Sequence, residues 1–243
     1  MPLQIPHPRQ LTRESLRAGT RVLCARDPDL ARIVDRLGPP PLWGRRPGYP
    51  TLVRIILEQQ VSLAAARTMY ARLRHAAGPV TPGSVAQLGV LGLRQLGFTG
   101  QKASYCVELA ATVLRGELDL GAVARATGEQ GRQRLLQVRG LGPWSVDIYF
   151  LMALRRPDVW PHGDLALMDA VCRVKGMRPR PDHATLTRFA ERWAPWRAVA
   201  ARILWSQYLA LRAIPAGPAR ASRDSTRKPA SSARRSGEQR RGG

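Results

Sequence analysis

A glycine-rich turn between two apolar segments constrains the fold of this chain more than any other feature of its sequence. Gly140-Leu141-Gly142 is followed by Pro143 within residues 135–164, LLQVRGLGPWSVDIYFLMALRRPDVWPHGD. Glycine permits left-handed backbone and close approach, and proline is favoured at the first position of a helix. The stretch predicts a helix, a tight turn and a second helix. The N–H groups at the start of that second helix would offer a phosphate a binding site.

The charge of the chain indicates where such a phosphate belongs. The 243 residues carry a formal net charge of +22, and the sequence pI is about 11.6. Arginine supplies nearly all of it, because the only lysines are Lys102, Lys175 and Lys228. Guanidinium groups are well shaped to bind phosphate oxygens, although an arginine-rich genome would also produce part of this excess. The composition favours a nucleic acid over a neutral metabolite as partner.

The spacing of the cysteines and histidines limits which disulfides and metal sites the chain can form. The three cysteines, Cys24, Cys106 and Cys172, are far apart and odd in number, and the four histidines are scattered. This pattern predicts neither a disulfide framework nor a zinc site or iron–sulfur cluster. No apolar run reaches the ~18 residues of a membrane span, and residues 1–10 lack the apolar core of a signal peptide. We expect a soluble cytoplasmic monomer without a membrane partner, associated with the nucleoid if the source is bacterial.

Apolar residues recur at helical spacing along most of the chain, and alternating strand patterns are absent. Asp27, Ser62, Asp164 and Asp182 each precede an apolar segment as an N-cap would. We predict an all-α fold of about ten short helices, in two lobes on either side of the central motif. The predicted parts are a flexible N-terminus over 1–10, a helical domain over 11–214 with its hairpin at about 132–154, and a disordered basic tail over 215–243. The tail has eight Arg or Lys and two acidic residues, and either adds nucleic-acid affinity or is a solvated end.

Two residues near the turn raise its value as a functional signal. Trp144 follows the turn directly, where an aromatic ring could stack on a base. Asp164 follows a loop, 155–163, that could fold back toward the turn. Its simplest interpretation is an N-cap, and a carboxylate at a helix N-terminus is stabilised in its charged form.

The central stretch resembles the helix-hairpin-helix and Gly/Pro…Asp motif of the HhH-GPD DNA glycosylase superfamily, and within it the 3-methyladenine DNA glycosylase II branch. Three further segments extend the resemblance over roughly residues 27–211. Residues 57–66, LEQQVSLAAA, resemble the I-x-x-Q-Q-[IV]-S-x-x-A-A segment of the family, while Gly97-Phe98 with Lys102-Ala103 and residues 193–197, WAPWR, resemble two others. Glu58 departs from the pattern, because many members have glycine there. Too few residues precede Asp27 for the β-rich N-terminal domain of some members, so we expect that domain to be lacking.

The resemblance implies a base excision enzyme that flips a damaged nucleotide out of double-stranded DNA and cleaves its glycosidic bond. Asp164 matches the catalytic aspartate of the family, where a carboxylate stabilises oxocarbenium character on the sugar or orients the attacking water. Gln60 matches the residue that enters the vacated stack, although it could be an ordinary helix-end residue. No cofactor is expected to be required. The resemblance also implies a Na⁺ or K⁺ ion on the backbone carbonyls of Leu136, Val138 and Leu141.

Trp144 distinguishes two chemistries within the resemblance. Bifunctional relatives have a lysine at this position, which forms a Schiff base and allows strand cleavage. Tryptophan cannot do so, so we predict a hydrolase without lyase activity. Trp144 and Trp205 match aromatic positions of the base pocket, where they would hold a cationic purine, although Trp205 could instead be a core residue. Tyr149 and Tyr208 are further pocket candidates, and the remaining DNA-binding candidates are Gly140, Leu141, Gly142, Ser145 and His162, of which His162 could instead cap the loop.

Two alternatives remain open. The same fold could act on uracil, hypoxanthine or an oxidised base, because pocket shape decides the lesion. The chain could also be a non-catalytic protein that uses the hairpin only to bind DNA. Asp164 and the Gln59-Gln60 segment count against that second alternative, since a binder needs neither.

Overall fold

Helices make up nearly all the regular structure of the chain, for which a computed structural model describes residues 8–213. No strand occurs within those residues, so the prediction of an all-α fold is confirmed. The helices are α1 Arg13–Arg26, α2 Pro28–Leu37, α3 Tyr49–Glu58, α4 Leu63–Ala77, α5 Pro82–Gln95, α6 Gly100–Leu114, α7 Leu120–Arg125, α8 Gly128–Leu136, α9 Pro143–Ile148, the π-helix η1 Tyr149–Ala153, α10 Leu165–Lys175, α11 His183–Ala190, the 3₁₀-helix η2 Glu191–Trp193 and α12 Arg197–Ala213.

The predicted N-caps are confirmed by their hydrogen bonds. The Ser62 hydroxyl accepts the N–H of Ala65 at the start of α4, and the Asp182 carboxylate accepts that of Thr185 at the start of α11. Each bond satisfies one of the N–H groups that have no partner inside the first helical turn. The cap signals in the sequence therefore locate these helix starts correctly.

Asp27 joins four helical segments. It ends α1, and its carboxylate caps α2. The same carboxylate accepts hydrogen bonds from Lys175 Nζ at the end of α10 (2.6 Å) and from Trp193 Nε1 in η2 (2.8 Å). Burial alone would raise the pKa of Asp27, but the hydrogen bonds from Lys175 and Trp193 outweigh it and lower that pKa.

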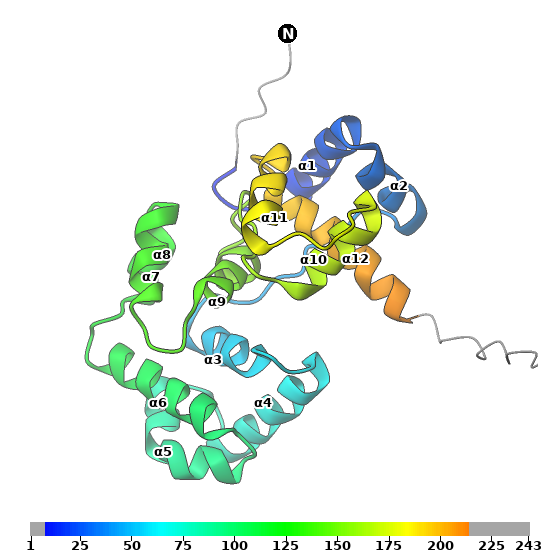
Figure 1. The fold of residues 1–243 in the computed structure, drawn as a ribbon. Helices are drawn as coiled ribbons and strands as arrows, with labels where there is room; N and C mark the ends of the chain where they lie inside the picture. Colours follow the sequence, from blue (N-terminus) through cyan, green and yellow to red (C-terminus); the bar gives the residue numbers. More distant parts are fainter. Residues whose placement is uncertain (1–7, 214–243) are drawn as a thin grey trace, which may run out of the picture.

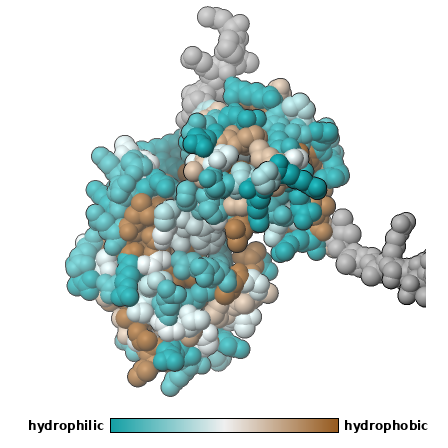
Figure 2. Space-filling model, in the orientation of Figure 1, coloured by the Kyte–Doolittle hydropathy of each residue, from teal (hydrophilic) through white to brown (hydrophobic). Residues whose placement is uncertain are grey.

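The helices form two lobes, as predicted (Figure 1). Helices α3 to α6 make one lobe, while α1, α2, α10, α11 and α12 make the other. Helix α9 lies at the junction, where it contacts α3 and α8. Figure 2 shows that this face is mainly hydrophilic and is indented where the lobes meet. The hairpin is thus placed between the lobes.

The ends of the chain differ in part from the prediction. Residues 8–10 were expected to be flexible, yet Arg9 Nη2 donates to the carbonyl of Arg125 (2.6 Å) and Arg156 Nη1 donates to the carbonyl of Arg9 (3.1 Å). These hydrogen bonds between residues far apart in sequence hold the segment against the domain. Residues 1–7 of the predicted N-terminus and the predicted tail, 215–243, lie outside the described residues. Among helices of residues 8–213, none has both the length and the apolar character needed to cross a bilayer.

Candidate active site

Asp164 stands directly before α10, at the end of the loop 155–163. Its Oδ1 atom accepts the N–H of Leu167 at 2.8 Å, so the side chain caps the helix as predicted. The residue is only partly buried. It therefore combines a fixed position with some exposed surface.

Two tryptophans donate hydrogen bonds to the same carboxylate. Trp144 Nε1 lies 2.9 Å from Asp164 Oδ2, and Trp205 Nε1 lies 3.2 Å from Asp164 Oδ1. Trp144 is the second residue of α9 and Trp205 lies on α12, so the contacts connect the hairpin to the last helix. All three donors to Asp164 are N–H groups, so both carboxylate oxygens act as hydrogen-bond acceptors. The structure brings together these three predicted site residues and fixes the orientation of the carboxylate.

The indoles contact Asp164 through the ring edge that carries the N–H group. Their π faces therefore take no part in these two hydrogen bonds. Trp144 is half-buried, whereas Trp205 is 9% exposed. Trp205 thus packs partly in the core, as its alternative interpretation expected, while it also reaches Asp164.

The two tyrosine candidates lie in different surroundings. Tyr149 is completely buried, and its hydroxyl accepts the N–H of Gly48 at 2.9 Å. Burial raises the pKa of that phenol. Tyr149 therefore has no exposed surface with which to contact a base, contrary to the prediction. Tyr208 is half-buried on α12 and has the guanidinium of Arg212 over its ring, 4.8 Å from the centroid.

Gln60 occupies an exposed turn between α3 and α4. Its φ of 55° lies in the left-handed region, which is uncommon for a residue other than glycine. This conformation costs on the order of 1 kcal/mol. The turn is therefore held by neighbouring contacts.

Gln59 supplies one of those contacts, a role that the sequence analysis did not assign. Its Nε2 atom donates to the carbonyl of Gly140 and to the hydroxyl of Ser145, both at 2.8 Å. Ser145 is 2% exposed, and its hydroxyl is paired with Gln59. It is therefore not presented to DNA, contrary to the prediction. One side chain thereby links the turn of Gln60 to the hairpin.

Lys102 fixes the same turn from the other side. Its Nζ atom donates to the carbonyl of Leu57, in the last turn of α3, at 2.6 Å. A cation at a helix C-terminus interacts favourably with the helix dipole. Burial lowers the pKa of the Lys102 ammonium group. The Lys102-Ala103 motif therefore has a structural function at the end of α3.

The two glycines of the hairpin serve different purposes. Gly140 has a φ of 95°, and a Cβ atom there would lie 2.7 Å from Cβ of Tyr105 and closer still to its ring. Gly142 has a φ of −79°, and a Cβ atom there would meet nothing within 4 Å. Gly140 is thus required by the backbone conformation and close packing of the turn, whereas Gly142 leaves open space at the surface of the hairpin. Leu141 is 2% exposed, so its side chain packs in the core and is not presented to DNA, contrary to the prediction.

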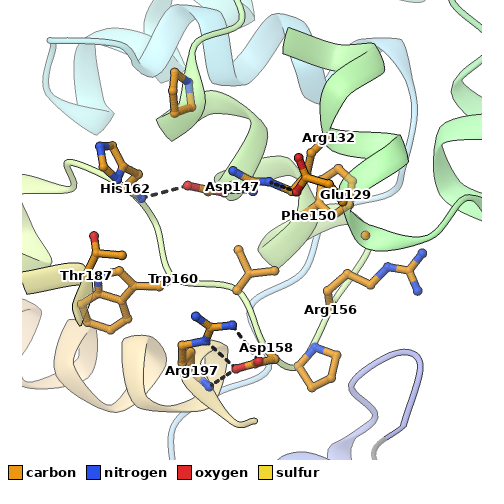
Figure 3. A pocket seen from close by; sticks show the side chains of 14 residues that line it. Glu129, Arg132, Asp147, Phe150, Arg156, Asp158, Trp160, His162, Thr187 and Arg197 are labelled. Carbon is orange, nitrogen blue, oxygen red and sulfur yellow. Dashed lines mark hydrogen bonds and ion pairs between the residues drawn. The ribbon is translucent and has the colours of Figure 1, made fainter. Parts of the chain in front are cut away.

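The loop that delivers Asp164 is fastened at both ends (Figure 3). At one end, Arg197 Nε and Nη2 donate to the Asp158 carboxylate at 2.7 and 2.8 Å. At the other end, Asp147 on α9 accepts the backbone N–H of His162 at 2.9 Å and pairs with Arg132 on α8. These side chains line a cavity of about 610 Å³. Burial raises the pKa of Asp147, although Arg132 and the His162 N–H act in the opposite direction.

Asp147 was also missed from the sequence, although it is an isolated acid within the apolar residues 146–153. Its neighbour in space, His162, has an exposed imidazole whose centroid lies 6.1 Å from that of His183. The backbone of His162 belongs to the fastening of the loop, and its ring is free to meet solvent.

The three backbone carbonyls assigned to a cation lie around the hairpin. The carbonyl of Val138 accepts the N–H of Leu141 at 3.0 Å. Within residues 8–213, no backbone N–H outside the helices donates to the carbonyls of Leu136 or Leu141. Carbonyl oxygens near the C-terminus of α8 suit a hard cation, because that end of a helix dipole is negative.

The comparisons with known proteins agree on one family. Residues 53–195, more than half of the chain, match the family described as HhH-GPD superfamily base excision DNA repair protein. The matched residues include the turn of Gln60, the hairpin and Asp164.

Relatives and solved structures agree with that match. A Bacillus subtilis protein, YfjP, is 28% identical over 165 residues, which cover 65% of this chain and 58% of YfjP. DNA-3-methyladenine glycosylase 2 of Escherichia coli is 30% identical over 164 residues, 63% of this chain and 55% of that protein. This chain therefore spans little more than half the length of these two relatives. The structure of Schizosaccharomyces pombe 3-methyladenine DNA glycosylase (Mag1) with abasic DNA shares the fold, with a TM-score of 0.68, 24% identity, and coverage of 77% of this chain and 95% of that one.

Proposed function

Since the chain belongs to the HhH-GPD superfamily of base excision DNA repair proteins, we propose that it is a monofunctional DNA glycosylase that removes alkylated purines from double-stranded DNA. The observation that carries the proposal is the Asp164 carboxylate held by the N–H groups of Trp144 and Trp205 beside the hairpin. The name of the Escherichia coli relative supports 3-methyladenine as one of the bases. A cationic purine such as 7-methylguanine is the other expected substrate.

Asp164 acts on the sugar in this proposal. As the bond between C1′ and the base nitrogen breaks, positive charge develops on the sugar ring. A fixed carboxylate close by stabilises that charge where water is scarce. The base leaves with the bonding electron pair, and water then adds its oxygen to C1′ and gives a proton to the Asp164 carboxylate. In a cationic base this pair neutralises the ring, so no side chain has to protonate it.

The tryptophans hold the base. Because the contacts of Trp144 and Trp205 to Asp164 use the ring edges, an exposed indole face can meet a planar ring. A cationic base over an indole gains about 0.5–2 kcal/mol. The same residues would thus orient the carboxylate and select the cationic base.

The turn between α3 and α4 and the hairpin contact the DNA. Extruding a nucleotide costs a few kcal/mol, and Gln60 fills the gap that is left. Its exposed position and left-handed backbone support this role. The open surface at Gly142 lets a phosphate approach the backbone of the hairpin.

The lysines support hydrolysis without strand cleavage. Lys102 is committed to the carbonyl of Leu57, and Lys175 to Asp27 and Asp29. Lys228 lies outside the described residues. The position beside Asp164 belongs to Trp144, whose indole cannot form a Schiff base.

A monovalent cation on the carbonyls of Leu136, Val138 and Leu141 is part of the proposal. Such an ion would strengthen the attraction of the hairpin for a phosphate. It has no part in the bond cleavage at the sugar.

A glycosylase of the same fold for uracil, hypoxanthine or an oxidised base is the second candidate. It would use the same carboxylate, and the pocket would have to accept a neutral base. The third candidate, a non-catalytic DNA-binding protein, has no use for a carboxylate oriented by two tryptophans.

One assay separates these candidates. Purified protein is incubated with duplexes that each carry one defined lesion, and hot alkali then reveals abasic sites as strand breaks. We expect breaks after alkali in duplexes with 3-methyladenine or 7-methylguanine, and none before alkali. Breaks only with uracil, hypoxanthine or an oxidised base would replace the first candidate by the second. The absence of release from every duplex, with DNA still bound, would leave the third.

Asp164→Asn tests the catalytic residue. The amide carries no charge to stabilise the sugar, so base release should fall by at least about 10³-fold. Affinity for the duplex, measured by fluorescence anisotropy, should be unchanged or higher because a negative charge is removed. Wild-type release by this variant would exclude Asp164 from the mechanism.

A further inference from the structure

The segment between α2 and α3, residues 38–48, places a third tryptophan next to the site. The ring centroid of Trp43 lies 6.5 Å from that of Trp205, with 59° between the ring planes. Trp205 in turn donates its N–H to Asp164. Trp43 is only half-buried, so part of its indole is exposed. We propose that Trp43 is a base-contacting residue that adds a third aromatic wall next to Trp205 and Asp164, an inference that rests on the proposed glycosylase function.

The backbone around Trp43 is fixed by long-range hydrogen bonds. The carbonyl of Trp43 accepts from Arg202 Nη2 at 3.0 Å, and the N–H of Arg45 donates to the carbonyl of Met152 at 2.9 Å. Gly48, at the end of the segment, donates its N–H to the hydroxyl of Tyr149. A loop fastened at three points presents its side chains in one position. Such rigidity is what a residue that must meet a bound base requires.

The departure of Glu58 from the family pattern fits the same interpretation. Arg45 Nη1 and Nη2 donate to the two Glu58 carboxylate oxygens at 2.9 and 2.8 Å. This bidentate pair is largely shielded, because the side chains are 22% and 13% exposed. The glycine that many family members have at this position could not form it. Glu58 thus supplies a charged fastening for the loop that carries Trp43.

A buried arginine, Arg202, also holds this loop in position. Its side chain is completely buried without a carboxylate partner, and its Nε atom has no hydrogen-bond partner among the described residues. Burial lowers the pKa of Arg202 to about 10, so the guanidinium stays charged at neutral pH. Burying a cation in this way is costly. Its guanidinium nevertheless donates hydrogen bonds to the carbonyls of Trp43 and Leu151. Arg202 itself lies on α12, about one helical turn before Trp205.

The electron-rich face of an indole favours a cationic ring over a neutral one. A wall at Trp43 would therefore favour 7-methylguanine over neutral bases. It would add nothing to the binding of a duplex that contains no base at the extruded position. This difference separates a base-contacting role from a structural one.

The experiment compares Trp43→Leu with Trp43→Phe. Leucine fills the space without a π face, while phenylalanine keeps one. Single-turnover release of 7-methylguanine should be about 5- to 30-fold slower for Trp43→Leu and within about threefold of wild type for Trp43→Phe. Leu42→Ala, a change in the same loop that leaves every ring in place, is the matched control and should also stay within about threefold.

Affinity for a duplex with a stable abasic-site analogue is the second measurement. It should be the same for the wild type and Trp43→Leu, because no base is present to contact Trp43. Equal losses of base release and of abasic-duplex affinity would assign Trp43 a structural role and overturn the inference. Normal release by Trp43→Leu would also overturn it while the proposed function stands. A wild type that releases no alkylated base refutes the proposed function, and this inference falls with it.

Discussion

Gln59 connects the two parts of the molecule that the proposed reaction requires to act together. Its Nε2 atom donates to the carbonyl of Gly140 and the hydroxyl of Ser145, 81 and 86 residues away in sequence. We predict that Gln59→Ala releases the turn of Gln60 from the hairpin. The variant leaves the backbone of α3 and the carboxylate of Asp164 unchanged.

The magnitude follows from the two hydrogen bonds. A neutral hydrogen bond contributes about 1 kcal/mol net, so the free energy of unfolding should fall by about 2 kcal/mol. For a domain of this size that corresponds to a melting temperature lower by about 4–8 °C. If the same free energy is lost from the transition state, in which Gln60 is proposed to occupy the DNA stack, base release should be about 30-fold slower.

Thermal unfolding and single-turnover release of 7-methylguanine measure the two effects. Gln133→Ala is the matched control, because Gln133 is exposed on α8 and its Nε2 donates only to the surface residue Glu129 in the described structure. The control should change stability by less than about 0.5 kcal/mol. If Gln59→Ala behaves like the control in both measurements, the hydrogen bonds between the turn and the hairpin contribute neither to stability nor to base release, and the prediction is refuted.

The hairpin glycines and Asp27 give two further predictions. Gly140→Ala should lower the free energy of unfolding by about 2–4 kcal/mol, because of its left-handed φ and the contact with Tyr105. Gly142→Ala should leave the free energy of unfolding within about 0.5 kcal/mol of the wild-type value but weaken duplex binding. Denaturant unfolding measures the first effect and fluorescence anisotropy the second. Equal stability of the two variants would contradict the different roles assigned to the two glycines. Asp27→Asn breaks the buried pair with Lys175 and should cost about 3 kcal/mol at pH 7. Because the folded pKa of Asp27 is lowered, its contribution is present above the unfolded value of about 3.9 and is lost as pH falls through the folded pKa. The difference in free energy of unfolding between the wild type and Asp27→Asn should therefore shrink as the pH falls below about 4. A difference that stays constant with falling pH would show that ionisation of Asp27 does not stabilise the fold.

Local signals in the sequence predicted the helix starts. Ser62, Asp164 and Asp182 act as N-caps, because capping depends only on a side chain and the N–H groups two or three residues later. The all-α class and the hairpin followed from apolar spacing and from the glycines. These features need no information about distant parts of the chain.

Contacts between distant segments could not be predicted in the same way. The buried hydroxyl of Ser145 accepts a hydrogen bond from Gln59, and the hydroxyl of the buried Tyr149 accepts one from the N–H of Gly48. The π-helix Tyr149–Ala153 has no cap or proline to announce it in the sequence. Each depends on which segment packs beside it, and the spacing of residues along one helix does not carry that information.

In the proposed mechanism, Asp164 joins two roles that enzymes often keep apart. In many enzymes the catalytic groups are poorly satisfied before substrate binds, so removing them makes the protein more stable. Here Oδ1 caps α10 and also accepts the N–H of Trp205, while Oδ2 accepts the N–H of Trp144. An asparagine offers one acceptor oxygen in place of two, and its NH₂ group would face an indole N–H. If Asp164 has the proposed catalytic role, selection for a stable fold and selection for activity act on this residue in the same direction, because a substitution that removes the carboxylate also removes contacts that stabilise the fold.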